Sequence, residues 1–171
     1  ETDYSTAFSS KGTSVLAGDN GSGSSLNQLS YPRDFSIDSS GNLYVADTQN
    51  NRIMKWIPGA IEGVQIANDI SYPWGIHVDS SNNIYVSSYY NAAVYKYTYS
   101  DGTYTRTTVA GGNGSGNALN QLQYPAGIHV DSAGNVYVAD RENHRIVKWE
   151  PGSSEGLVVA GGNSNGSALN Q

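Results

Sequence analysis

YPRDFSIDSSGNLYVADTQNNRIMKW, residues 31–56, decides the fold of this chain because it recurs twice more. The second copy, residues 72–97, reads YPWGIHVDSSNNIYVSSYYNAAVYKY, and the third, residues 124–149, reads YPAGIHVDSAGNVYVADRENHRIVKW. Short alternating runs between turn residues, repeated every 40 to 50 residues or so, are typical of stacked β units. The repetition therefore predicts a repeated all-β architecture rather than one compact mixed domain.

Each copy divides into four expected strands. The first strands are expected at residues 35–38, 76–79 and 128–131, and the second at 43–46, 84–87 and 136–139. The third are expected at 52–56, 93–97 and 145–149, and the fourth at 64–67, 106–110 and 157–160. Turn sequences such as Asp-Ser-x-Gly and Pro-Gly separate them. Four antiparallel strands per copy, without helical periodicity, predict a propeller blade.

The motif YPxGIxVDxxGNxYVAD with NxRI resembles the NHL-repeat family of β-propellers, over residues 13–171. The resemblance implies an all-β fold of NHL-type β-propeller blades, with three four-stranded repeats and an extra N-terminal strand. It implies no single activity, because NHL propellers include binding platforms, ubiquitin-ligase targeting modules, RNA readers and one class of lyase.

The phase of the repeats predicts how the chain is divided. We expect an N-terminal arm or tail at residues 1–12 and an extra outer strand, at 14–17, with its loop in 13–28. The repeats should occupy residues 29–67, 68–118 and 119–171.

Three blades do not close an ordinary ring, so something else should cover the end faces. We expect apolar residues to be exposed there, namely Ile37, Val45 and Ile53 at one end and Ile128, Val138 and Ile146 at the other. Either further blades or a second copy complete the propeller, or the extra strand adds to a neighbouring chain in a head-to-tail fibre.

Two charge pairs stand at the same five-residue spacing. Asp47 with Arg52, and Asp140 with Arg145, flank the turn between the second and third strands, whereas the middle copy has Ser88 and Ala93. Because losing one partner would strand a partly buried charge, the joint loss predicts structural salt bridges within each blade.

Composition indicates an extracellular protein. The chain has no Cys and a formal net charge of −6, and its solubility rests on Asn, Ser, Gly and Tyr rather than on charge. Asn-Gly-Ser sequons at Asn20, Asn113 and Asn165 lie between one fourth strand and the next first strand, and we expect them at equivalent positions. They predict N-glycosylation, although Asn-Gly-Ser also forms turns. Any secretion signal should have been removed or lie outside this sequence.

Aromatic side chains crowd the second copy. Tyr89 and Tyr90, beside the turn between its second and third strands, are candidates for binding carbohydrate or protein, because tyrosine offers a flat ring with a hydroxyl group. Strand propensity alone also favours tyrosine.

His77 and His129 occupy the same position of their first strands, where the first copy has Ser36. Inward histidines from several blades can gather a metal, and NHL-like lyases resemble such an arrangement, but two His and one Ser form an incomplete set. We therefore expect no metal and no cofactor.

These observations favour a non-enzymatic, secreted NHL-repeat protein that self-associates, as a dimer or head to tail, and binds protein or carbohydrate. The alternative is a fragment of an NHL-type lyase with a channel metal site. Nucleic acid is an unsuitable partner for an acidic chain with nine dispersed basic residues, and no apolar run is long enough to span a membrane.

Overall fold

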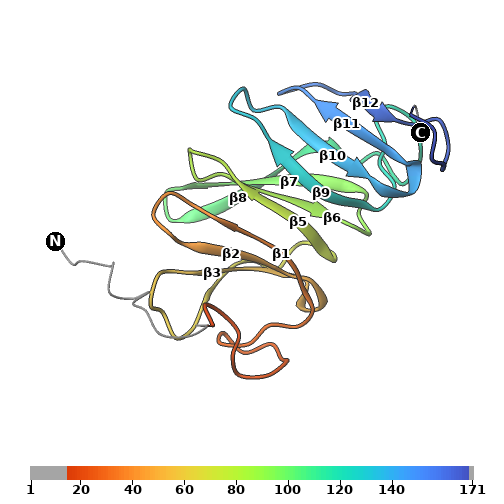
Figure 1. Cartoon of the computed structure of the whole chain (residues 1–171). Helices are drawn as coiled ribbons and strands as arrows, with labels where there is room; N and C mark the ends of the chain where they lie inside the picture. The colour runs from red at the N-terminus through yellow and green to blue at the C-terminus, as the bar shows by residue number, and fades with distance from the viewer. Residues whose placement is uncertain (1–14, 170–171) are drawn as a thin grey trace.

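Three antiparallel four-stranded sheets form the protein, and the computed structural model describes residues 15–169. Figure 1 shows the sheets stacked face to face, in chain order, as three consecutive blades of a propeller. Within the described residues the only helical turns are two short 3-10 segments, η2 (Thr48–Asn50) and η3 (Arg141–Asn143). The predicted all-β, blade-type fold is confirmed.

Each blade is a meander whose strands pair in sequence order. Blade 1 contains β1 (Pro32–Ile37), β2 (Leu43–Asp47), β3 (Arg52–Trp56) and β4 (Val64–Ala67). Blade 2 contains β5 (Pro73–Val78), β6 (Ile84–Ser88), β7 (Ala93–Ser100) and β8 (Thr103–Gly111). Blade 3 contains β9 (Pro125–Val130), β10 (Val136–Asp140), β11 (Arg145–Trp149) and β12 (Leu157–Gly161).

An aspartate closes the turn between the first two strands of every blade. In blade 1, Asp38 Oδ1 accepts the N–H groups of Ser40 and Asn42, both at 2.9 Å, and Oδ2 accepts the Asn42 amide and the Tyr44 hydroxyl. Burial alone would raise the pKa of Asp38, but these hydrogen bonds lower it below its usual value. Asp79 and Asp131 repeat the arrangement, which explains the recurrent Asp-x-x-x-Asn-x-Tyr spacing.

The core consists of the layers between blades. Between blades 1 and 2, the side chains of Tyr44, Ala46 and Ile53 pack against Ile84 and Val86. The equivalent layer between blades 2 and 3 consists of Ala, Val and Leu side chains around one Tyr and one Trp. It comprises Tyr85, Ala92, Val94, Ala110, Leu122, Val130, Val136, Val138, Val147 and Trp149. Because each strand alternates its side chains, every blade contributes one face to each neighbour.

The expected extra strand is not formed. Residues 15–17 have no strand pairing, while Ser14 lies outside the described residues. A fourth strand pairs with the third strand of its own blade, and the third strand that would precede residues 15–17 is not present among the described residues. The segment instead packs Ala17, together with Leu29, against Val45, Met54 and Trp56 of blade 1.

The predicted exposure of the end-face residues is correct only in part. Ile37 is 52% exposed, but Val45 is 4% exposed beneath Ala17 and Leu29, and Ile53 and Val138 are fully buried between blades. Ile128 and Ile146 are half-buried. The error arose because Val45 and Ile53 point to opposite faces of blade 1, since Val45 pairs with Met54 and Ile53 with Ala46.

Candidate functional site

A stack of aromatic rings crosses the end of the molecule at which β1, β5 and β9 begin. The Tyr89 ring stacks on Trp74 with centroids 4.8 Å apart, and on Tyr124 with centroids 4.5 Å apart. The Arg33 guanidinium lies 4.5 Å from the Trp74 ring centroid, a cation–π contact. We call Trp74, Tyr89 and Tyr124 the aromatic column; with Arg33 it joins residues from all three blades.

Further polar and aromatic groups border the column. Arg141 donates a hydrogen bond to the Tyr89 hydroxyl at 2.9 Å. Tyr72 lies with its ring centroid 5.0 Å from that of Tyr90, and Tyr90 is tilted at 85° to Tyr89. Tyr90 is 61% exposed. The candidate binding residues Tyr89 and Tyr90 are thus brought together, but Tyr89 is mostly enclosed by its neighbours and Tyr90 faces solvent.

Backbone strain gathers at the same end. Tyr31, Tyr72 and Tyr124, each before a proline, have φ values of 47°, 52° and 53°. Positive φ is uncommon for a bulky residue, and such conformations often occur at functional sites.

The aromatic column can support flat, partly apolar ligands. Its inner ring faces are already used, so the surfaces left for a ligand are the partly exposed Tyr124 and the exposed Tyr90. Ring faces pack against the apolar side of a sugar or of another aromatic group, and phenol and guanidinium groups donate hydrogen bonds at the rim. These groups are suited to binding such a ligand.

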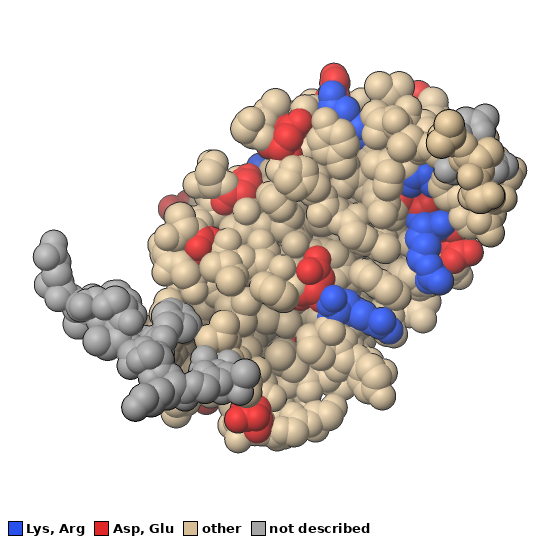
Figure 2. Space-filling view, in the orientation of Figure 1, with Lys and Arg blue, Asp and Glu red and all other residues tan. Residues whose placement is uncertain are grey.

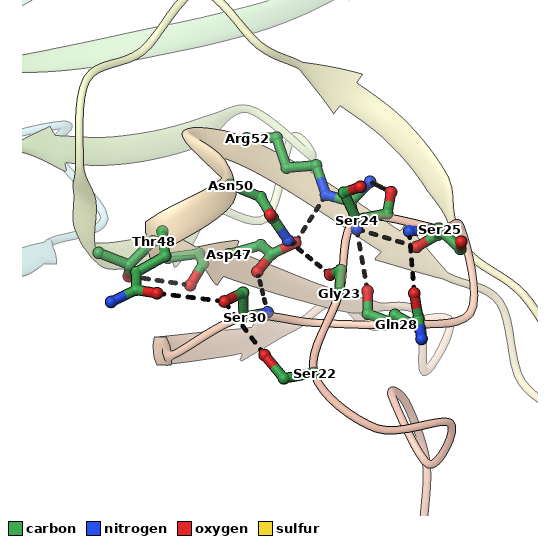
Figure 3. Close-up of polar contacts among 12 residues, drawn as sticks. Ser22, Gly23, Ser24, Ser25, Gln28, Ser30, Asp47, Thr48, Asn50 and Arg52 are labelled. Carbon is green, nitrogen blue, oxygen red and sulfur yellow. Dashed lines mark hydrogen bonds and ion pairs between the residues drawn. The ribbon is translucent and has the colours of Figure 1, made fainter.

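The predicted charge pairs lie beside the column and do more than join two strands. In blade 1, Arg52 Nε lies 2.6 Å from Asp47 Oδ2, and both side chains are almost fully buried (Figure 3). The Arg52 guanidinium also donates to the backbone carbonyls of Ser24, Ser25 and Gln28. The pair therefore clamps the loop that enters the blade.

Blade 3 repeats this clamp. Arg145 Nε lies 2.7 Å from Asp140 Oδ2, and the guanidinium donates to the carbonyls of Asn117, Ala118 and Gln121. We call residues 20–28 and 113–121 the junction loops.

An asparagine completes each clamp. Asn50 donates to Asp47 Oδ2 and to the Gly23 carbonyl, both at 2.8 Å (Figure 3). In blade 3, Asn143 donates to Asp140 Oδ2 and to the Gly116 carbonyl at 2.8 and 2.9 Å. This role was missed from the sequence, although the recurrence of Asn together with the Asp–Arg pair was visible there.

The sequons lie in or after these loops. Asn20 and Asn113 are exposed, and their amide groups donate to the carbonyls of Asn27 and Asn120 within the loop, at 3.4 and 3.0 Å. Asn165 is also exposed. Its expected equivalence is wrong, because positive φ at Gly21, Gly114 and Ser164 aligns Asn20 and Asn113 with Asn163, two residues earlier.

His77 and His129 lie next to each other on the inner strands, with ring centroids 5.2 Å apart at 74°. Burial lowers the pKa of His77, and the neighbouring His129 lowers it further, whereas Asp79 opposes the shift. Ser36 holds the equivalent position in blade 1, so no third imidazole joins His77 and His129, and its hydroxyl oxygen accepts the Val78 N–H. Over residues 15–169 no group of three or more His, Cys, Asp or Glu side chains is placed to hold a metal ion.

One face of the molecule carries few charged side chains. Figure 2 shows a mostly uncharged face, with the charged side chains in small separate groups. Among the described residues no helix is both long and apolar enough to cross a bilayer.

Comparisons with known proteins agree with this architecture. The NHL repeat family model matches residues 29–56 and 122–149, the two copies that carry the clamp. A comparison with curated proteins gave no match.

Solved structures share the fold at low identity. An auxiliary nutrient binding protein from Bacteroides ovatus is 14% identical over 80% of this chain and 37% of its own, with a TM-score of 0.64. A second one, from Bacteroides thetaiotaomicron, is 18% identical over 85% of this chain and 41% of its own, also at 0.64. A virginiamycin B lyase from Staphylococcus aureus is 19% identical over 74% and 40%, at 0.55. The chain therefore spans about two fifths of each of these structures.

Proposed function

Because the chain contains NHL repeats and folds as blades of a β-propeller, we propose that it is a non-enzymatic, extracellular binding module. Its ligand is a carbohydrate or a protein, and the module self-associates. The observation that carries this proposal is the aromatic column with its exposed neighbour Tyr90. The two nutrient binding proteins of the same fold are consistent with a binding role.

A carbohydrate fits the site better than a protein does. The free aromatic surface comes from only two side chains of the column and its border, Tyr90 and Tyr124, which are 61% and 36% exposed. A stable protein interface buries roughly 800 Å² on each partner. Sugar stacking needs far less area, and hydroxyl and guanidinium groups stand at the rim to bond sugar hydroxyls.

The test is binding to a panel of immobilised oligosaccharides, followed by titration calorimetry with the strongest binder. We expect Tyr90→Ala and Tyr124→Asn each to weaken binding about tenfold, the effect of losing one stacking contact of about 1.4 kcal/mol. Asn is chosen at position 124 because it tolerates the positive φ. Tyr99→Thr, at an exposed tyrosine outside the column, is the matched control. Equal binding by all four proteins would exclude this site.

Extracellular location and glycosylation belong to the same proposal. Asn20, Asn113 and Asn165 are exposed, as an acceptor must be. Protein from a eukaryotic secretory pathway should show added glycan mass, removable by glycosidase, on the peptides that contain these residues. Unmodified peptides at all three positions would contradict glycosylation without affecting the binding proposal.

The alternative is an NHL-type lyase with a channel metal, which the adjacent imidazoles of His77 and His129 bring into consideration. A catalytic zinc takes three protein ligands, and only two imidazoles meet here. We therefore place this second. Elemental analysis showing about one zinc per chain, lost in His77→Ser, would favour the lyase.

A further inference from the structure

We propose that the open face of blade 3 docks onto the open face of blade 1 in a second copy of the chain, so that two copies close a ring of six blades. This inference deepens the self-association included in the proposed function. It rests on the two interfaces inside the molecule, because the open faces carry the residues that those interfaces already bury.

The open face of blade 3 repeats the faces that blades 1 and 2 turn toward their next neighbour. Tyr137, Ala139 and Ile146 are half-buried. Their counterparts in blade 1 are Tyr44, Ala46 and Ile53 and in blade 2 Tyr85, Ser87 and Val94, and all six are at most 4% exposed. Another blade is therefore the structure that would cover this face of blade 3.

Among residues 15–169 no preceding blade covers the open face of blade 1. Phe35 is 62% exposed and Ile37 52% exposed. The residues at the place of Phe35 in the other blades are Ile76, which is buried, and Ile128, which is half-buried. Phe35 thus belongs to a set of positions that contact the preceding blade.

A glycine near the start of the first strand of blades 2 and 3 also indicates where a neighbouring blade would make contact. A Cβ atom on Gly75 would lie 2.5 Å from the Ala126 carbonyl oxygen and 3.1 Å from Gly127 Cα, so blades 2 and 3 approach closely there. Gly127 is the equivalent residue of blade 3, and a Cβ atom on it would meet nothing within 4 Å. Glycine at position 127 leaves the room that a neighbouring inner strand uses at Gly75, whereas blade 1 has Asp34 there, whose carboxylate accepts the Ile76 N–H of blade 2.

Six blades lie within the four to eight that propellers use to close. Because the contact joins two different faces, it must either close a ring or continue as a fibre. Two three-blade halves close it with two identical contacts.

The experiment measures native mass by sedimentation equilibrium on the full chain at tens of micromolar. We expect the mass of two chains for the unmodified protein and of one chain for Gly127→Val. Valine should leave the fold intact, because nothing lies within 4 Å of a Cβ atom at this position and φ is not positive at this glycine. Phe35→Thr with Ile37→Thr should also give one chain, by removing apolar surface from the other side of the contact.

Two controls keep the test decisive. Tyr99→Thr, which alters an exposed tyrosine of the middle blade, should keep the mass of two chains. Circular dichroism and thermal unfolding establish that each variant remains folded. A monomeric unmodified chain, or a dimer that survives in Gly127→Val, would overturn the proposal. Oligosaccharide binding is measured separately through Tyr90 and Tyr124, so a failure of one inference leaves the other standing.

Discussion

Asp47, Asn50 and Arg52 act together to hold a loop. Comparison with blade 2, which lacks the charged pair, explains this role. Blades 1 and 3 hold a long junction loop through three carbonyl groups. In blade 2 the residues equivalent to the charged pair are Ser88 and Ala93, and Ser88 donates to the Ser71 carbonyl of a shorter connection. Blade 2 therefore lacks both the long junction loop and the charged pair that would hold it. Holding the loop explains the joint loss of the two charges better than strand pairing alone does.

Arg145→Ala should destabilise the fold strongly. The change leaves Asp140 as a buried charge with no cation and removes the donors from three loop carbonyls. Breaking one side of a buried ion pair costs about 3–5 kcal/mol. Urea unfolding should show a loss of that order. Lys148→Ala, at the solvent-exposed Lys148–Glu150 pair, should cost far less, because solvent screens such a pair. Equal losses in the two variants would contradict the clamp.

His77 should make stability depend on pH in a defined direction. Its pKa is lowered in the fold, mainly by burial and then by His129, so the unfolded chain binds the proton more readily. The contribution is complete above the unfolded pKa of about 6.5 and is lost as pH falls toward the lower folded value. Unfolding free energy should therefore fall between pH 7 and 5. His77→Ser, which introduces the residue of the first copy, should flatten that part of the profile; an unchanged slope would exclude His77 as its source.

At the scale of the strand, side-chain hydroxyl groups join blade to blade. Ser87 Oγ accepts the Gly75 N–H at 2.8 Å and donates to the Ala126 carbonyl at 2.6 Å, across the boundary between blades 2 and 3. Thr48 Oγ1 makes a similar contact with the Pro73 carbonyl between blades 1 and 2. These bonds satisfy backbone groups that strand pairing within a blade does not use.

Ser87→Ala should cost about 1–3 kcal/mol, because it leaves a buried N–H and a carbonyl without this partner. Blades 1 and 3 carry alanine at this position, as Ala46 and Ala139, so the fold of a blade accepts alanine there. A loss of stability in Ser87→Ala would therefore report the missing hydrogen bonds and not an unsuitable side chain. Chemical denaturation of Ser87→Ala beside Ser81→Ala, at an exposed turn serine, measures the difference. A neutral Ser87→Ala would show that the blades do not need the bridge.

The strands were predictable from the sequence because each blade repeats one alternating pattern, and the twelve strands expected in the repeats correspond to the twelve observed within residues 15–169. The extra strand was predicted from the same pattern and is absent, because a strand requires a partner edge and not only a sequence. The aromatic column was predictable only through Tyr89. Trp74 and Tyr124 lie on other strands and connections, and their stacking depends on how blades 2 and 3 are placed relative to each other.

At the scale of the whole molecule, residues 15–17 cover part of the end face of blade 1 in the way that blade 2 covers blade 3. Ala17 and Leu29 pack on Val45 and Trp56 of blade 1. Ala110 and Leu122 hold the corresponding places against Val138 and Trp149 of blade 3. Residues 15–17 therefore occupy the site that the end of a preceding blade's fourth strand would fill, while Phe35 and Ile37 stay exposed beside it.

Deleting residues 1–17 should consequently strengthen the proposed pairing. In the six-bladed ring, the end of β12 from the second copy, with Ala160, would take the place of Ala17, so the two segments compete for one site. Removing a competing contact worth about 1.4 kcal/mol should lower the dimer dissociation constant about tenfold. Sedimentation equilibrium over a dilution series measures this constant, with Gly127→Val in the shortened chain as the control that should stay monomeric. A weaker dimer after deletion would mean that the segment joins the interface, as strand addition requires, instead of competing with it.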